Sequence, residues 1–145
     1  MGDALAKDLL LTLMALLGSA SFAVVFRTPK RYFIHTVIVG FVASLGIMIC
    51  PPQWDIGFST FVTALAVSCL SHFVSRKTRA PAQCFLIPGV IFLVPGTYIY
   101  RSFSSVMSGE NATAGSLALQ ALTITLGISF AILLANLLVP PRKAL

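Results

Sequence analysis

Residues 117–139 read LALQALTITLGISFAILLANLLV, and no charged side chain interrupts them. An α-helix rises about 1.5 Å per residue, so about 20 apolar residues cross the roughly 30 Å hydrocarbon core of a bilayer. This stretch is therefore long and apolar enough to span a membrane. Four other stretches have the same character, at residues 4–26, 33–50, 56–74 and 82–106. The sequence predicts an all-α integral membrane protein with five transmembrane helices, and residues 1–145 form a single transmembrane domain.

The composition agrees with a protein surrounded by lipid. Hydrophobic residues make up 57% of the chain and charged residues 10%, against about 25% charged residues in an ordinary globular domain. The net charge is +6, but the positive charges stand at the ends of the apolar stretches and form no patch or arm. Nucleic acid is therefore not expected as a partner, whereas the lipid bilayer is.

The positive charges also predict the orientation. Apart from Lys7 and Arg101, all Lys and Arg residues fall in three segments, at 27–31, 76–79 and 142–143. With five spans these segments share one side of the membrane, which the positive-inside rule makes cytoplasmic. We therefore expect the N-terminus outside and the C-terminus in the cytoplasm.

Small residues recur every fourth position on three of the predicted helices. In lipid, such residues allow helices to approach closely, and this packing drives their association. We expect these seams to be helix contacts. They are formed by Ala15, Ser19 and Ala23; by Thr60, Ala64, Ser68 and His72; and by Thr123, Gly127, Ala131 and Ala135.

The fourth apolar stretch carries the most informative pattern, CFLIPGVIFLVPGTYIYR at residues 84–101. Two Pro-Gly pairs, Pro88-Gly89 and Pro95-Gly96, interrupt it. Each proline removes a backbone donor and clashes with the carbonyl four residues earlier, and each glycine permits non-helical conformations. We predict a helix broken at both pairs. Irregular backbone at membrane depth is tolerated where it is buried in protein or lines a wet cavity, as in the broken helices of transport sites.

A helix that restarts at Pro95-Gly96 would present free N–H groups and a partial positive charge, which favour a bound carboxylate. Arg101 follows, and its guanidinium can hold a carboxylate through two hydrogen bonds. We therefore assign a substrate path to Pro88, Gly89, Pro95, Gly96, Tyr98, Tyr100 and Arg101. In the alternative interpretation the helix ends at Val94 and Arg101 caps an outer loop.

Three residues on other helices are weaker candidates for contact with substrate or protons. Asp8 is a carboxylate within an apolar stretch, where such groups are expensive and often functional. Thr60 and His72 lie on the partly hydroxylated seam of the third stretch. Asp8 and His72 could equally be anchors at the two membrane interfaces.

Nothing in the sequence indicates catalysis. The chain has no Walker loop, no H-E-x-x-H, no G-x-S-x-G and no paired catalytic carboxylates. Cys50, Cys69 and Cys84 show no metal-binding spacing and are expected to be free thiols. We expect no enzyme, no catalytic residues, no metal and no cofactor.

At the fourth stretch the sequence resembles the threonine/serine exporter (ThrE) family, specifically its C-terminal-type five-helix half. Two other segments agree in order and spacing, and the resemblance covers nearly the whole chain. One departure is Phe92, where many relatives have a third proline. The matching segments are IPG at 87–89 with LVPGxxxY at 93–100, FAVVFxxPxR at 22–31, and STF at 59–61.

This resemblance implies a small subunit of a two-component exporter in the bacterial inner membrane. Full-length members of the family have ten helices and export small amino acids, driven by the proton gradient. In split members a second five-helix subunit supplies the other half, and such pairs are also associated with export of the dicarboxylate succinate. The expected partners are thus that second subunit and a small carboxylate substrate. The assembly is either a pair of halves or a larger oligomer.

Two other classes of protein share some of these features. A structural or assembly protein of the membrane would have the same spans and charge asymmetry, but it would not need a broken helix. A membrane-embedded enzyme would need ionisable residues clustered at one depth. Asp8, His35, His72 and Arg101 lie on different predicted helices and are split between the two faces, which argues against the enzyme.

Overall fold

The computed structural model describes residues 2–51 and 53–140, with side chains described from Leu10 onward except at 11, 12 and 15. Within these ranges all the regular structure is helical, so the predicted all-α class is confirmed. The elements are α1 (Gly2–Val25), α2 (Phe33–Ile49), α3 (Ile56–Thr78), α4 (Gln83–Val90), the 3₁₀ turn η1 (Ile91–Leu93), α5 (Gly96–Met107) and α6 (Asn111–Leu138).

Three of the described segments are long and apolar enough to cross a membrane: Ile56–Thr78, Gln83–Met107 and Asn111–Leu138. The second of these combines α4, η1 and α5. Two shorter apolar helical segments, Leu16–Val25 and Phe33–Ile49, belong to α1 and α2. The helices start and end near the predicted stretches, except that α6 begins earlier, at Asn111 rather than at 117.

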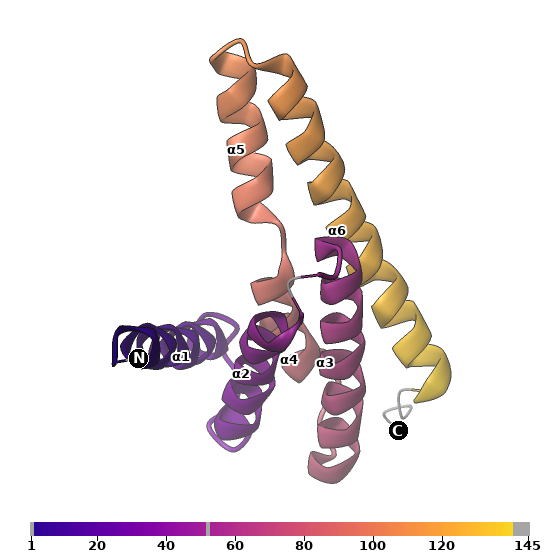
Figure 1. The fold of residues 1–145 in the computed structure, drawn as a ribbon. Coiled ribbons are helices and arrows are strands. Elements are labelled where there is room, and N and C mark those ends of the chain that lie inside the picture. Colours follow the sequence, from indigo (N-terminus) through magenta and orange to yellow (C-terminus); the bar gives the residue numbers. More distant parts are fainter. Residues whose placement is uncertain (1, 52, 141–145) are drawn as a thin grey trace.

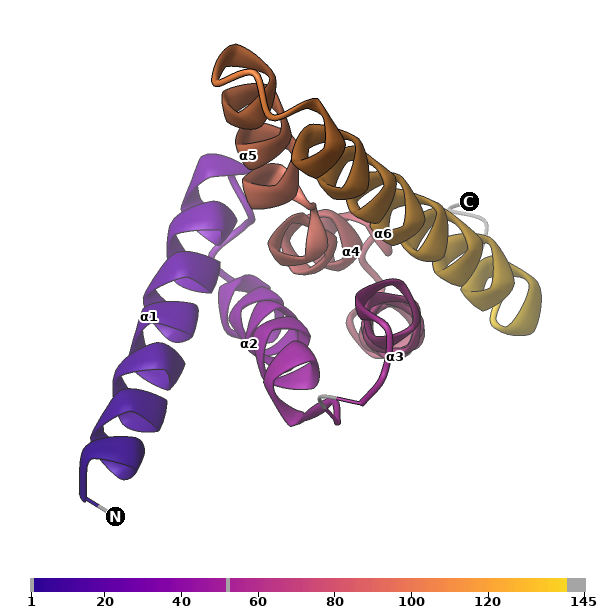
Figure 2. The ribbon, with the colours of Figure 1, turned by 45° about the horizontal axis from the view of Figure 1, so that its top comes forward.

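The helices are arranged around the pair formed by α3 and α6 (Figure 1). α5 folds back along α6, α2 and α4 pack against α3, and α1 lies on the outside against α2 (Figure 2). In Figure 1, α3 is seen from the side and α1 nearly end-on, so these two helices run in different directions. The chain alone therefore does not form a bundle with a single axis.

The predicted small-residue seams of α3 and α6 lie against each other, a pairing that the sequence does not indicate. Gly127 of α6 approaches the backbone of α3 so closely that an added Cβ would lie 3.0 Å from the carbonyl oxygen of Gly57. Further along, Ala64 and Ser68 of α3 and Ala131 of α6 are fully buried. Such close approach of backbones is how small residues hold helices together in lipid.

α3 and α6 run in the same direction. Near the start of α3, a Cβ at Gly57 would lie 3.2 Å from Thr123 of α6. Near the end of α3, Arg76 donates a hydrogen bond from Nη2 to the carbonyl of Pro140, just after α6, at 3.3 Å. Because both helices run from the same end of the molecule, the segments that follow them lie close together.

The hairpin of α5 and α6 projects beyond the start of α3 (Figure 1). Ser102 of α5 donates a hydrogen bond to the carbonyl of Ala114 on α6 at 2.9 Å, whereas Gly57 lies beside Thr123. The interval from Ala114 to Thr123 corresponds to about 13 Å along a helix axis. The part of α5 near Ser102 is therefore packed on α6 alone.

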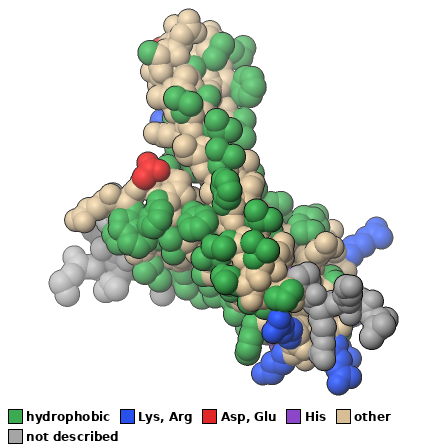
Figure 3. All heavy atoms as spheres, turned by 90° about the vertical axis from the view of Figure 1, so that its right-hand side faces the viewer, with side chains coloured by type: hydrophobic (Ala, Val, Ile, Leu, Met, Phe, Trp, Pro, Cys, Tyr) green, Lys and Arg blue, Asp and Glu red, His purple; other side chains and the backbone are tan. Residues whose placement is uncertain are grey.

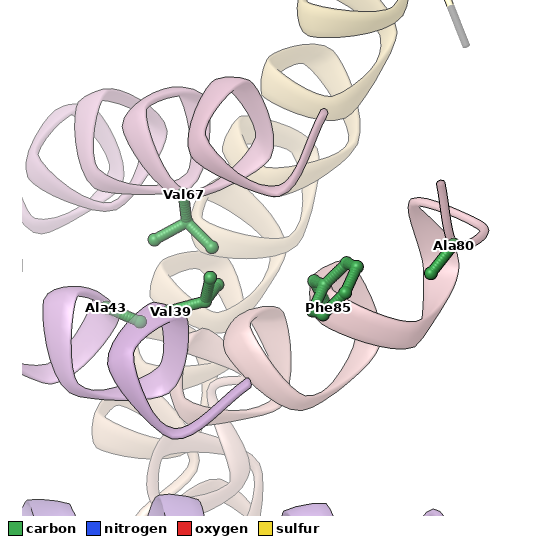
Figure 4. Packing of buried hydrophobic residues seen from close by; sticks show 5 residues of the cluster. All are labelled: Val39, Ala43, Val67, Ala80 and Phe85. Atoms are coloured by element: carbon green, nitrogen blue, oxygen red, sulfur yellow. The ribbon is translucent and has the colours of Figure 1, made fainter. Parts of the chain in front are cut away.

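α4 packs into an apolar cluster with α2 and α3 (Figure 4). Phe85 of α4 is fully buried there, and its ring lies edge-on to Tyr32, with the centroids 6.0 Å apart. Gly89 lies between Val39 and Val67, and an added Cβ would come within 2.8 Å of a methyl group of each. The absence of a side chain at Gly89 thus sets how closely α4 approaches its neighbours.

The break predicted at the first Pro-Gly pair is wrong. α4 continues through Pro88 and Gly89 to Val90, and the irregular backbone starts only at Ile91. A proline inside a helix removes one hydrogen bond, here the one to the carbonyl of Cys84. Burial of Pro88 and the close packing of Gly89 keep the helix intact despite this loss. The second pair does interrupt the helix.

Exposed positive charges gather at one end of the molecule (Figure 3). The loops before α2 and before α4 meet there, where Tyr32 donates a hydrogen bond from Oη to the carbonyl of Thr78 at 3.4 Å. Arg142 and Lys143 of the third predicted basic segment lie outside the described residues. The exposed residues at this end are Arg27, Lys30, Arg31, Arg76, Lys77 and Arg79.

Gly89→Ala should destabilise the fold, because its Cβ would press on Val39 and Val67. Overpacking typically costs about 1–3 kcal/mol, whereas alanine itself gains about 1 kcal/mol over glycine within a helix. Gly115→Ala on α6 is the matched control, since nothing lies within 4 Å of its added Cβ. We expect Gly89→Ala to unfold about 1–3 kcal/mol more easily than Gly115→Ala in mixed micelles, measured by circular dichroism.

Shortening Val67 to alanine should restore much of this loss in the Gly89→Ala background. Equal stability of the Gly89→Ala and Gly115→Ala proteins would contradict the packing role of Gly89.

Candidate functional site

The helix break lies at Val94 and Pro95. Val94 is extended, with φ −62° and ψ 129°, as expected for a residue before proline. Pro95 has φ −78° and ψ 46°, and the N–H of Gly96 donates to the carbonyl of Val94 at 2.8 Å, forming a tight turn. Because Pro95 has no N–H, the carbonyl of Ile91 instead accepts a long bond of 3.4 Å from Val94.

The break is held in place from one side. Leu93 and Pro95 are buried, and Leu93 packs in a cluster with Ala64 of α3 and with Ile124 and Ile128 of α6. Ala64 lies near the middle of α3, so the irregular backbone lies at the depth of the helix centre rather than at its end. Backbone of this kind requires protein or water around it.

The start of α5 is open. No side chain caps the helix, and nothing lies within 4 Å of a Cβ added at Gly96. The first N–H groups of a helix have no partner within the helix, and here those of Thr97 and Tyr98 follow the turn at Pro95. This end of α5 can therefore accept a hydrogen-bonding anion such as a carboxylate.

α5 presents three different faces, none of them fully buried in the described chain. Tyr98, Ser102 and Ser105 are half-buried toward α6, and Ser102 is bonded to it. A second face is apolar and exposed, with Ile99, Tyr100, Phe103, Val106 and Met107. The third is the α5 polar strip, which consists of the exposed residues Thr97, Arg101, Ser104 and Ser108.

Arg101 lies on the same face as the open start of α5. Residues four apart on a helix are neighbours, with Cβ atoms about 5–6 Å apart, so Arg101 stands one turn above Thr97. Helical side chains lean toward the N-terminus of their helix. The guanidinium of Arg101 can thus reach back toward an anion held at Thr97.

The other residues of the predicted substrate path are spread over the structure. Tyr98 packs against the cluster between α3 and α6. Tyr100 is 74% exposed on the apolar face of α5, away from the polar strip. Pro88 and Gly89 are buried in α4. Of this predicted path, the structure therefore leaves Gly96 at the open start of α5, Arg101 one turn beyond Thr97 on the polar strip, and Pro95 buried beside the break.

The candidates on α3 are buried. Thr60 donates its hydroxyl to the carbonyl of Ile56 at 2.7 Å, so its side chain is already paired. Ser68 and His72, one turn apart, are 0% and 4% exposed. Among the described residues, Ser68 Oγ and His72 Nε2 are buried without a hydrogen-bond partner. The side chain of Asp8 lies outside the described part of the chain.

The family model described as threonine/serine exporter, ThrE, matches residues 11–138. The chain belongs to this family. No curated protein and no solved structure matches it, so the family model carries the assignment. Membership in an exporter family agrees with the apolar helices and indicates a membrane transport protein rather than an enzyme.

The threonine/serine exporter motifs at 22–31 and 87–89 meet in space. They border a cavity of about 250 Å³ between the end of α1 and α4, which we call the α1–α4 cavity. Its polar members Arg27, Thr28 and Gln83 were not identified from the sequence. In the sequence, these two motifs were the signal that could have indicated this cavity, but only the fold shows that they face each other. The cavity is lined by Phe26, Arg27, Thr28, Pro29, Gln83, Cys84, Ile87 and Pro88.

Phe92, the departure from the family pattern, fills space between the first two helices. Its ring lies edge-on to Phe22 of α1, with the centroids 5.4 Å apart. It also lies within 3.1 Å of a Cβ added at Gly18 and 3.2 Å of one added at Gly40. The ring therefore supports the contact of α1 and α2 with η1.

Within the described part of the exporter chain, no group of three His, Cys, Asp or Glu residues is placed to hold a metal.

Ser68 and Ser71 allow a direct test of the unpaired hydroxyl. Both are fully buried on α3, but Ser71 donates to the carbonyl of Val67 at 2.8 Å and Ser68 has no partner. We expect Ser71→Ala to lower the free energy of unfolding by about 1 kcal/mol, and Ser68→Ala to leave it unchanged or raise it. Unfolding of the purified chain in detergent measures both. Equal losses for the two variants would show that Ser68 is paired.

Proposed function

We propose that this chain is the small subunit of a two-component exporter of small carboxylate solutes, of the threonine and serine type, in the bacterial inner membrane. The observation that carries this proposal is the open start of α5 with Arg101 one turn away. Free N–H groups, the helix dipole and a guanidinium on one face make a binding site for the carboxylate of an amino acid. Family membership supports the same substrate class.

The exposed α5 polar strip argues for a second subunit. A charged side chain that faces lipid costs about 2.5–3.5 kcal/mol at the centre of the membrane and less toward either interface, and the strip runs outward from Thr97, beside the break, to Arg101 and Ser108. In the described chain Arg101 and its neighbours on the strip are exposed, so in the membrane they need cover from water or from protein. A second five-helix subunit of the same family would cover the strip. The break at Val94 and Pro95 would then face a substrate path enclosed between the two subunits.

Protons are proposed as the driving force, with His72 as the group on this chain that carries one. Support comes from its Nε2, which is buried on α3 without a hydrogen-bond partner. Asp8 remains a second proposed proton contact.

Five spans are proposed, with the N-terminus outside and the C-terminus in the cytoplasm. Support comes from the shared direction of α3 and α6, which five spans require. The gathering of exposed cations at one end agrees with a cytoplasmic face there.

The carboxylate site also suits a dicarboxylate such as succinate, and a protein without transport activity is the remaining alternative. Transport assays with each solute separate these functions. A structural or assembly protein would export none of them.

Arg101→Gln should reduce carboxylate export by about tenfold or more, because a hydrogen bond to a charged group contributes about 1.5–3 kcal/mol. The measurement is export of labelled threonine, serine or succinate from vesicles that contain both subunits. Lys77→Gln is the matched control, since it also removes one exposed positive charge but lies at the other end of the molecule. Unchanged export by Arg101→Gln at normal expression would refute the assignment of this residue.

The proposed orientation predicts that the end of α3 and the hairpin of α5 and α6 are accessible from opposite sides of the membrane. In a variant without its native cysteines, a cysteine at Ser108 should react with an impermeant maleimide added outside cells. A cysteine at Lys77 should react only after the cells are opened. Labelling of Lys77→Cys in intact cells would contradict the orientation.

A further inference from the structure

We infer that the α1–α4 cavity is a loading site for a small α-amino acid on the basic, cytoplasmic side of the membrane. This inference rests on the proposed export function and adds to it a second binding site, distant from the start of α5. The residues that line it include one with a cationic side chain, two with neutral polar side chains, and Cys84, whose backbone carbonyl lacks its helical donor. These groups match the two charges of an amino acid.

Arg27 supplies the positive charge, and its backbone has a conformation that arginine rarely adopts. α1 ends in a Schellman motif, in which the N–H of Thr28 donates to the carbonyl of Ala23 at 3.0 Å and that of Arg27 to Val24 at 2.9 Å. Such a motif requires a left-handed residue, usually glycine. Here Arg27 takes that conformation, with φ 49°. Strained residues of this kind often lie at binding sites, and Arg27 lines the cavity.

Pro88 supplies the opposite polarity. Because proline has no N–H, the carbonyl of Cys84 cannot receive the hydrogen bond that a helix normally provides. Cys84 and Pro88 both line the cavity, so this carbonyl belongs to a lining residue. A carbonyl accepts hydrogen bonds and can bind an ammonium group. The amide of Gln83 and the hydroxyl of Thr28 add further hydrogen-bonding groups.

The cavity has room for a small amino acid. Its volume is about 250 Å³, several times the roughly 30 Å³ that a water molecule takes up in the liquid. A solute of the size of serine or threonine can therefore enter it.

The location suits the first step of export. The cavity lies between the loop that follows α1 and the first turns of α4, at the end where the exposed cations gather. Positive charge around an opening raises the local concentration of carboxylates. A solute bound here stands at the beginning of α4, and α4 leads through η1 to the break and the start of α5.

The test compares Arg27→Gly with Arg79→Gly. Both arginines are exposed and have left-handed backbone, with φ 49° and 57°, so glycine relieves strain at either position and the fold should survive. Only Arg27 lines the cavity. Vesicles of phosphatidylcholine and phosphatidylethanolamine, which contain no anionic lipid, hold both subunits, and serine export is measured against its concentration on the cytoplasmic side.

We expect Arg27→Gly to raise KM by about tenfold with little change in the maximal rate, because lost ground-state binding appears in KM. Arg79→Gly should keep the KM of the unmodified protein. Equal KM values for Arg27→Gly and the unmodified protein, or equal increases for both variants, would overturn the loading site. If the proposed export function itself is wrong, the result differs from both of these, because the unmodified pair of subunits then exports no serine.

A second variant tests the carbonyl. Pro88→Ala restores an N–H that can pair with Cys84. Glycerate, which carries a hydroxyl in place of the ammonium of serine, should compete poorly with serine in the unmodified protein. In Pro88→Ala this preference for serine should fall by several fold. An unchanged preference would exclude the Cys84 carbonyl from ammonium recognition.

Discussion

The missing N–H of Pro95 is the constraint on which the candidate site depends. In lipid every backbone polar group needs a partner, because no water is present to replace a lost hydrogen bond. At Pro95 the chain gives up one helical bond, adopts a tight turn and starts a new helix at Gly96. The new helix has its own unpaired N–H groups. Pro95 thus creates unpaired N–H donors at the depth of the helix centre. In an uninterrupted helix these N–H groups would be bonded within the helix.

The rest of the chain supports this interruption through close packing. Glycines at Gly57 and Gly127 let α3 and α6 touch along their backbones, and Gly89 lets α4 approach α2 and α3. Lipid tails are as apolar as leucine, so side-chain burial alone would hold these helices together only weakly. The small residues therefore determine where η1 and the break lie relative to α3 and α6.

Much of this arrangement follows from the sequence in physical terms. Apolar length gives the helices, and four-residue spacing gives the small-residue seams on α3 and α6, but not that these two seams face each other. The sequence correctly predicts that Pro95 breaks its helix, but the break it predicts at Pro88 is wrong, because the outcome there depends on how Gly89 packs against Val39 and Val67. The same limit applies to the α1–α4 cavity. Nothing local to Arg27 reveals its left-handed backbone, since a sequence does not show which loop faces which helix.

The length of α6 has a consequence for the surrounding membrane. Its 28 residues extend for about 42 Å, while the hydrocarbon core is roughly 30 Å thick. The helix must lean over, or its first turns with Asn111 and Thr113 must stand in the headgroup layer. Either adjustment has a free energy that changes with bilayer thickness. The tilt of α6, or the depth at which its first turns lie, is thereby coupled to the acyl-chain length of the host lipids.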